Sequence, residues 1–153
     1  MDVAEVVRTA AAVIGSGSVV VAARALRHTR QQARTAFEDS LAREYRDIAG
    51  RLPPAAFFQH GQAQLNEEQK QALFRYFDLS NEQLRLIEEE RIRPETAGVW
   101  TAGISALMAR DTFRRYWQEL HRGLPSDFFS SLEASYNKLE LANSIEEETV
   151  DGA

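Results

Sequence analysis

TAAAVIGSGSVVVAA, residues 9–23, contains no charged side chain and lies between Arg8 and Arg24. The fold depends on where this run belongs, because such a segment is a membrane anchor, a secretory signal or a buried helix of a soluble domain. A signal peptide has a positively charged start and a cleavage site of small residues, whereas Asp2 and Glu5 precede this run and Arg24 follows it directly. The sequence therefore disfavours a signal peptide and leaves the other two alternatives.

The uncharged run is short for a membrane-spanning helix. Its fifteen residues extend about 22 Å at a rise of about 1.5 Å each, against a hydrocarbon core of about 30 Å. Apolar flanks lengthen the candidate span to residues 3–26, with Arg8 and Arg24 extending toward the interface. We interpret residues 1–26 as a single-pass membrane anchor and keep a soluble helix as the alternative.

Basic residues gather after the run, and they predict its orientation. They are Arg24, Arg27, Arg30 and Arg34. The other end carries Arg8 together with two acidic residues, so the positive-inside rule places the N-terminus outside and the C-terminal domain in the cytoplasm, at a bacterial inner membrane. The arginines then lie along anionic lipid headgroups, each contributing about 1 kcal/mol. In the alternative, they form the solvated face of a helix in a soluble cytoplasmic protein.

Small residues recur on one side of a helix through the run, at Ala11, Gly15, Ser18 and Ala22. Such a stripe allows a second helix to approach closely, so these residues are candidates for helix association. Alternatively, residues 15–18 form a turn that folds two short apolar helices against a soluble core.

Residues 27–52 have the pattern of a basic amphipathic juxtamembrane helix. Apolar residues recur every three or four positions, at Phe37, Leu41, Tyr45, Ile48 and Leu52. This stripe needs a covering surface, supplied by the rest of the chain or by a second subunit in a short coiled coil. Phe37, Leu41 and Tyr45 are the candidate partner surface if the rest of the chain leaves them uncovered. Pro53 and Pro54 end the helix.

Helix starts are predicted at five further positions: Asn66, Ser80, Pro94, Asp111 and Ser126. No segment between them has the alternating pattern of a strand. The fold class is therefore all-α, an N-terminal apolar helix continuing into a long amphipathic helix, followed by a small bundle of short helices. Residues 53–141 form the helical cytoplasmic domain, and residues 142–153 an acidic flexible tail.

The composition excludes several kinds of chemistry. The chain has no cysteine, so thiolate metal sites, disulfides and cysteine nucleophiles are ruled out. Its histidines, His28, His60 and His121, are too scattered for a metal pair on one helix. A hydrolase built on Glu82, Glu89 or His60 stays as a third hypothesis, but exposed carboxylates on one helix are far more often solvation. We expect neither catalysis nor a cofactor.

A nucleic-acid interface is also disfavoured. Basic and aromatic side chains do mix on one segment, at Arg110, Arg114, Arg115, Tyr116, Trp117 and Arg122. However, residues 53–153 carry ten basic against seventeen acidic side chains, which is no basic footprint. Tyr116 and Trp117 are better explained as core, the arginines as partners of nearby carboxylates, and Trp100 and Trp117 as candidates for the core centre.

A family resemblance rests on aromatic and aliphatic positions. The segment YFDLSNEQ at 76–83, Arg91-Ile92, Trp100 with Gly103, and Phe113 with Trp117 resemble the bacterial family catalogued as domain of unknown function 4760. The resemblance covers most of residues 34–132. It implies an N-terminal hydrophobic helix, a basic helical continuation and a small helical cytoplasmic domain, and it implies no activity.

The sequence thus predicts a membrane-tethered helical module that binds another protein, associates with itself and contacts an anionic lipid surface. Neither an enzymatic activity nor nucleic-acid binding is expected. The alternative is a soluble all-α protein, such as an immunity or regulatory factor, whose N-terminal helix belongs to the core.

Overall fold

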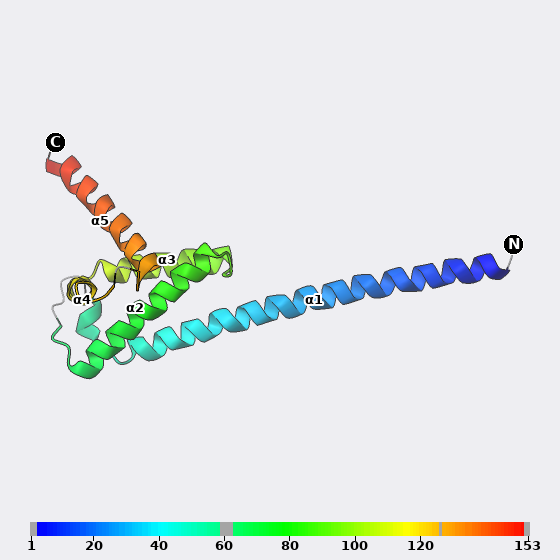
Figure 1. The fold of residues 1–153 in the computed structure, drawn as a ribbon, viewed down its shortest axis with the longest axis horizontal. Helices are drawn as coiled ribbons and strands as arrows, with labels where there is room; N and C mark the ends of the chain where they lie inside the picture. Colours follow the sequence, from blue (N-terminus) through cyan, green and yellow to red (C-terminus); the bar gives the residue numbers. More distant parts are fainter. Residues whose placement is uncertain (1–2, 59–62, 126, 152–153) are drawn as a thin grey trace. The chain divides into compact units, whose positions relative to one another are not determined.

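The computed structural model describes the backbone of residues 3–58, 63–125 and 127–151, and the side chains of residues 21–58, 63–125 and 127–142. Along the chain (Figure 1) follow α1 (Val3–Ala49), the short 3₁₀ helix η1 (Pro54–Phe57), α2 (Glu67–Glu88), α3 (Pro94–Met108), α4 (Asp111–His121) and α5 (Ser130–Asp151). These described residues include no strand, so the prediction of an all-α fold is confirmed.

The chain divides into two units, Met1–Asp39 and Ser40–Ala153, with α1 contributing residues to both. In the first unit every described side chain from residue 21 to residue 33 is exposed. None of the helices in the described part of the chain combines the length and the apolarity that crossing a bilayer requires. The predicted anchor lies mostly in residues 1–20, whose side chains are outside the described residues.

Two of the predicted helix starts are confirmed by their local geometry. Asn66 caps α2, because its side-chain oxygen accepts from the Gln69 N–H at 2.9 Å while the Gln69 side chain accepts from the Asn66 N–H at 3.0 Å. This reciprocal pair satisfies two backbone donors that the first turn leaves without partners. Pro94 opens α3, where its missing N–H costs no helical hydrogen bond.

The predicted restart at Ser80 is wrong, because α2 runs without interruption from Glu67 to Glu88. Ser80 is buried, and Asn81 caps a different helix. Its side-chain oxygen accepts hydrogen bonds from the backbone N–H groups of Ser131 and Leu132, both at 3.1 Å, at the start of α5. A residue with capping chemistry thus serves a helix fifty positions away in the chain, which local sequence does not reveal.

The core of the second unit is aromatic and centres on Trp117. Its indole ring, 2% exposed, lies 5.3 Å from the Phe77 ring, 5.6 Å from Phe129 and 6.0 Å from Tyr136, measured between ring centroids. Large aromatic side chains bury the most apolar surface per residue and favour such tilted pairs. Trp100 is only half-buried, so the prediction that both tryptophans lie at the core centre holds for Trp117 alone.

The last turns of α1 belong to this core. Leu41 and Ile48 from α1, and Leu52 after it, are buried, while the Tyr45 ring lies 6.3 Å from that of Tyr76 on α2. An exposed ion pair between Glu44 and Arg75, at 3.3 Å, also joins α1 to α2. Within this unit, the apolar stripe predicted for the amphipathic helix is therefore covered by the chain itself.

A tight turn connects α2 to α3. Glu90 has a φ of 57°, in the left-handed region. The Arg91 N–H donates to the Leu86 carbonyl at 2.9 Å and the Glu90 N–H to the Ile87 carbonyl at 3.0 Å, which is the double hydrogen bond of a Schellman motif. This reversal places α3 against α2, and Ile92 is buried directly after it.

Replacing Asn81 tests its role as a remote cap. In Asn81→Ala two partly buried N–H groups lose their acceptor, so we expect the free energy of unfolding to fall by about 1–2 kcal/mol. The measurement is urea denaturation of the intact protein followed by far-UV circular dichroism. Asn137→Ala, an exposed position on α5, is the matched control and should change little. Equal losses in the two variants would contradict the assignment.

Candidate functional site

A groove of about 410 Å³ lies where the end of α1, α2 and α3 meet. Its apolar wall comes from α3, with Trp100, Ile104 and Leu107. Ala42, Tyr45 and Arg46 line it from α1, Tyr76 and Gln83 from α2, and Val99 and Gly103 complete the α3 side. Grooves of a few hundred Å³ with mostly apolar walls and few polar groups are typical of small-molecule sites.

Two buried polar side chains on α2 border the groove, two helical turns apart. Tyr76 is 3% exposed, and among the described residues its hydroxyl has no hydrogen-bond partner. Burial raises the pKa of this hydroxyl far above its ordinary value, against a smaller lowering by the nearby Ser80, so Tyr76 is neutral. Gln83 is 5% exposed, and its carboxamide makes no hydrogen bond to any described residue. A buried polar atom without a partner, such as the Tyr76 hydroxyl, is uncommon in folded proteins.

The charge at the groove is positive. Arg46 is the one charged side chain in its lining, is exposed, and forms no ion pair with the described residues. Tyr45 is half-buried beside it. Every polar side chain lining the groove can donate a hydrogen bond, and none carries a negative charge.

Glycine opens the α3 side of the groove. A Cβ atom built on Gly103 would meet no other atom within 4 Å, and the same holds for Gly98 one and a half turns earlier. Both glycines lie inside α3, where glycine costs about 1 kcal/mol relative to alanine. Gly103 borders the groove, whereas Gly98 on the same helix does not.

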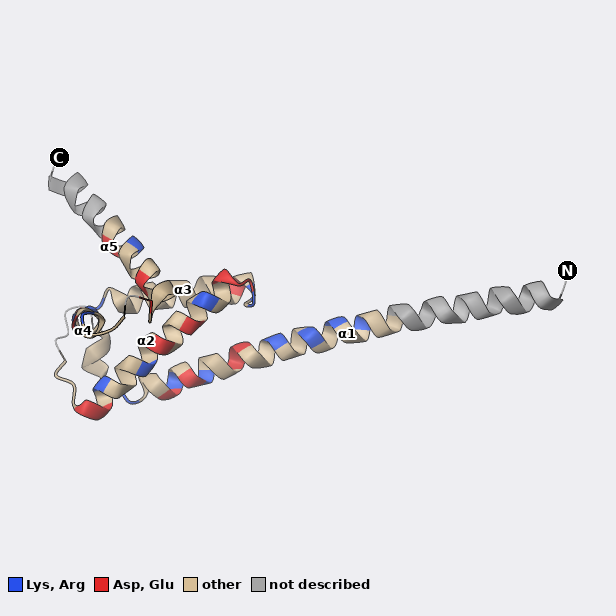
Figure 2. Ribbon diagram, in the orientation of Figure 1, with Lys and Arg blue, Asp and Glu red and all other residues tan. Residues whose placement is uncertain are grey.

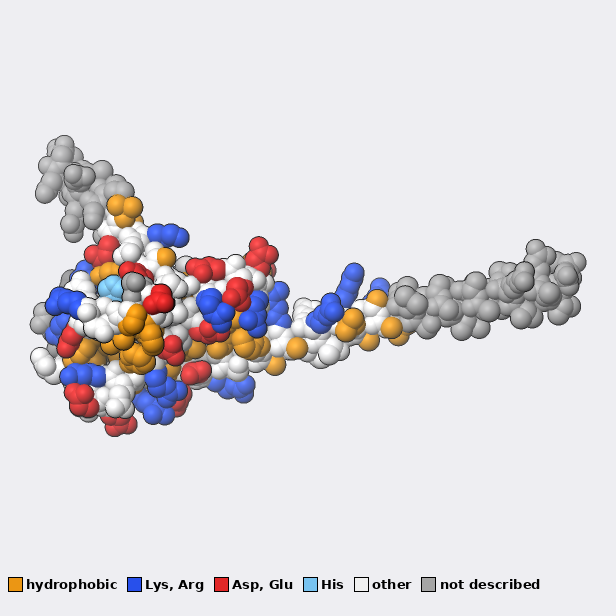
Figure 3. Space-filling view, viewed as in Figure 1, with side chains coloured by type: hydrophobic (Ala, Val, Ile, Leu, Met, Phe, Trp, Pro, Cys, Tyr) orange, Lys and Arg blue, Asp and Glu red, His pale blue; other side chains and the backbone are white. Residues whose placement is uncertain are grey.

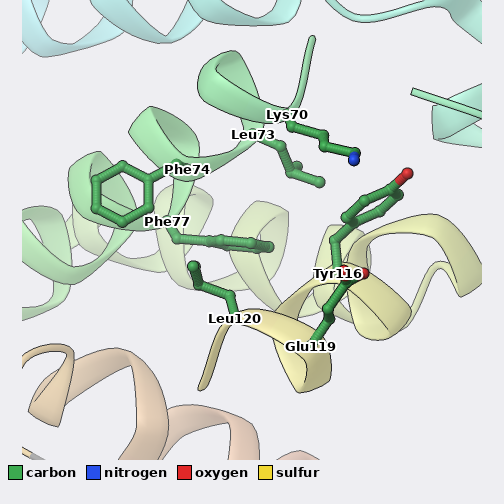
Figure 4. Close-up of a pocket in the computed structure, with 7 residues that line it drawn as sticks. All are labelled: Lys70, Leu73, Phe74, Phe77, Tyr116, Glu119 and Leu120. Carbon is green, nitrogen blue, oxygen red and sulfur yellow. The ribbon is translucent and has the colours of Figure 1, made fainter. Parts of the chain in front are cut away.

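A second, smaller hollow of about 140 Å³ lies between α2 and α4 (Figure 4). Its apolar side consists of Leu73, Phe74, Phe77 and Leu120, and its polar side of Lys70, Tyr116 and Glu119. The Lys70 ammonium lies 2.8 Å from the Glu67 carboxylate, which raises the pKa of Lys70. At this volume the hollow is below the usual size of a small-molecule site.

Glu82 and Glu89, the carboxylates of the hydrolase hypothesis, do not border either hollow. Arg85 pairs with both predicted carboxylates, at 2.7 Å from Glu82 and 2.6 Å from Glu89. His60 lies outside the described residues. His121 stacks on Trp117 with ring centroids 5.4 Å apart, and its Nε2 lies 3.3 Å from a Glu133 oxygen. Within the described residues no group of three histidines and carboxylates is arranged to hold a metal ion.

The basic residues predicted to contact lipid lie on α1 (Figure 2). Arg24, Arg27 and Arg30 are exposed and form no ion pair with described residues. Arg34 is half-buried, with its Nε 3.8 Å from a Glu38 oxygen. Apolar side chains are exposed among these arginines (Figure 3), with Val21 68% and Leu26 52% exposed.

The residues predicted for helix association and for a partner surface differ in whether the structure describes them and in how exposed they are. Ala22 is exposed, while the side chains of Ala11, Gly15 and Ser18 lie outside the described residues. Phe37 keeps 37% exposure, but Leu41 is buried and Tyr45 half-buried. The condition that these three be uncovered therefore fails for Leu41, because the core of the second unit includes it.

The two arginines of α4 have partners within the protein. Arg114 pairs with Asp111 at 2.8 Å, and Arg115 donates to the Ala63 carbonyl at 2.7 Å. Asp111 is the first residue of α4, one position after the N-cap residue Arg110.

Sequence reasoning missed the groove. Its lining comes from three helices, and only their packing brings Arg46, Gln83 and Trp100 to one place. The available signal was the pair of glycines inside a helical pattern at Gly98 and Gly103, which often marks a packing or functional reason.

Comparison with models of protein families, with curated proteins and with solved structures gives no match. The resemblance noted from the sequence stays a prediction.

The Tyr76 hydroxyl can be tested by removing it. In Tyr76→Phe an unpartnered buried polar atom disappears, so we expect the free energy of unfolding to stay equal or to rise by up to about 1 kcal/mol. Tyr136→Phe is the matched control: its hydroxyl accepts from the Gln118 amide at 3.3 Å, so its removal should cost about 0.5–1 kcal/mol. Urea denaturation measures both. A larger loss in Tyr76→Phe than in Tyr136→Phe would show that the Tyr76 hydroxyl has a partner.

Proposed function

We propose that this protein is a membrane-tethered helical module that binds another protein and associates with itself. The observation that carries the proposal is the exposed stretch of α1 after the apolar run. From residue 21 to residue 33 all side chains are exposed, including Val21, Leu26 and the three arginines without ion pairs. An unpacked helix of this kind needs another stabilising surface, since isolated helices are marginal in water.

An anionic bilayer supplies that surface. The apolar run at residues 9–23 inserts with its apolar flanks, and Arg24, Arg27 and Arg30 contact lipid phosphates on the cytoplasmic side. Each arginine contributes about 1 kcal/mol near such a surface. The N-terminus then lies outside the bacterial inner membrane, and the helical domain lies in the cytoplasm.

Tethering also explains how the module would act without chemistry. Confinement to a bilayer raises the effective concentration of the chain, so weak contacts suffice for assembly. Ala11, Gly15, Ser18 and Ala22 offer a stripe of small residues to a second copy. Phe37, farther along α1, adds partly exposed apolar surface. The proposed role is therefore localisation and assembly, with no catalytic step.

The runner-up is a soluble all-α regulatory or partner-binding protein. In that case the apolar run covers a protein surface, as part of a core or of an oligomer interface. The two proposals differ in where the full-length chain is found after cell lysis.

The test is membrane fractionation of the full chain with a C-terminal tag. We expect the wild type to pellet with membranes, to resist alkaline carbonate and to be released by mild detergent. Ile14→Arg puts a charge at the middle of the run, at a cost of about 2.5–3.5 kcal/mol to insertion, and should shift the chain to the carbonate-soluble fraction. Leu141→Arg, at an exposed position on α5, is the control and should leave fractionation unchanged. Full recovery of the wild type in the soluble fraction would overturn the tether and favour the runner-up.

A further inference from the structure

We propose that the groove between α1, α2 and α3 binds a small amphipathic carboxylic acid, with the apolar body against α3 and the carboxylate toward Arg46 and Gln83. The inference goes beyond the proposed tether and does not depend on it. It makes the helical domain a sensor or carrier of such acids.

The size and the walls of the groove suit a small apolar body. Its volume of about 410 Å³ lies within the range of small-molecule sites. Trp100, Ile104 and Leu107 present aromatic and aliphatic surface on one side, and the Tyr45 ring adds to it from α1. Covering the half-buried side chains of Trp100, Leu107 and Tyr45 removes apolar surface from water, which favours binding.

The polar side chains of the groove favour an occupant that accepts hydrogen bonds. Gln83 is almost fully buried, borders the groove and has no partner among the described residues, so its amide N–H is available to an occupant. Arg46 adds a positive charge and further donors without an ion pair among the described residues. A carboxylate accepts from both, and hydrogen bonds to a charged group are stronger than those between neutral groups.

The same groups disfavour other occupants. A cationic amphiphile would face Arg46 with no carboxylate in the lining to compensate. A neutral alcohol would use fewer of the donors and would gain no attraction from the guanidinium. The groove therefore distinguishes molecules of one shape by the charge of their polar end.

A set of three probes with one ring system tests this selectivity: 2-naphthoate, 2-naphthylmethanol and 2-naphthylmethylammonium. Calorimetric titration is made into the full chain, in lipid nanodiscs if only detergent extracts it, with empty nanodiscs as the blank. We expect 2-naphthoate to bind at least tenfold more tightly than either of the other two. Equal binding of all three, or preference for the ammonium, would overturn the proposal.

Two glycine variants locate the site. Gly103→Leu projects a side chain into the groove from a position where a Cβ meets no atom, and it also raises helix propensity, so the fold is kept. Gly98→Leu makes the same change on the same helix away from the groove. We expect Gly103→Leu to weaken 2-naphthoate binding at least tenfold, and Gly98→Leu to leave it unchanged, with similar thermal unfolding of both. Equal affinities in the two variants would place the binding elsewhere and overturn the proposal.

Charge variants test the position of the carboxylate. Arg46→Gln should lower 2-naphthoate affinity about fivefold, a modest effect because the guanidinium is exposed, and should leave 2-naphthylmethanol unaffected. Arg43→Gln, an exposed arginine on the same helix that does not line the groove, is the control. Identical effects of the two substitutions would overturn the assignment.

The outcome separates this proposal from the tether. Gly103→Leu and Gly98→Leu have the same N-terminal segment, so any difference in their affinity for 2-naphthoate comes from the groove. The test therefore remains valid if the protein proves not to be tethered to a membrane. If 2-naphthoate binds neither the wild type nor Gly98→Leu while Gly103→Leu loses self-association, the groove is a protein-docking surface and the small-acid proposal is wrong.

Discussion

The packing of α2 against the other helices of its unit is the constraint on which the rest of the structure depends. Phe77 contacts Trp117 of α4, Tyr76 contacts Tyr45 of α1, and Asn81 caps the first turn of α5. Phe77 and Asn81, four residues apart, lie on one side of this uninterrupted helix and Tyr76 lies on another, so α2 sets the position of each neighbour. The aromatic core therefore forms around a helix that also holds the two polar side chains of the groove.

The groove and the core both include residues of α2, but they differ in whether their polar side chains have hydrogen-bond partners. Around Trp117 the rings fill space with apolar contacts, and the nearby polar side chains have partners, as Gln118 has in Tyr136. At the groove, the buried Tyr76 hydroxyl has no hydrogen-bond partner among the described residues, and Gln83 borders the groove beside it on α2. Departures from polar satisfaction tend to concentrate at functional sites, because selection retains them there at a cost in stability. This difference is what separates the groove from the smaller aromatic hollow.

The part of α1 before residue 40 differs from both the core and the groove in the exposure of its side chains. Its described side chains from residue 21 to residue 33 are exposed, whereas Leu41 and Ile48 on the same helix are buried. One helix thus carries residues with two environments, an exposed basic stretch and a core-forming stripe.

The sequence by itself determined the elements that depend on near neighbours. Apolar spacing predicted helices throughout, and Asn66 with Gln69 and Pro94 marked two starts, because caps and prolines act within one turn of the chain. The end predicted at Pro53 and Pro54 falls after the observed end of α1 at Ala49, and Pro54 opens η1. Only the tertiary structure decided that α2 passes through Ser80, that Asn81 caps α5, and that Trp100 borders a groove while Trp117 is core. These outcomes depend on contacts between residues far apart in the chain, so packing overrode the local signals.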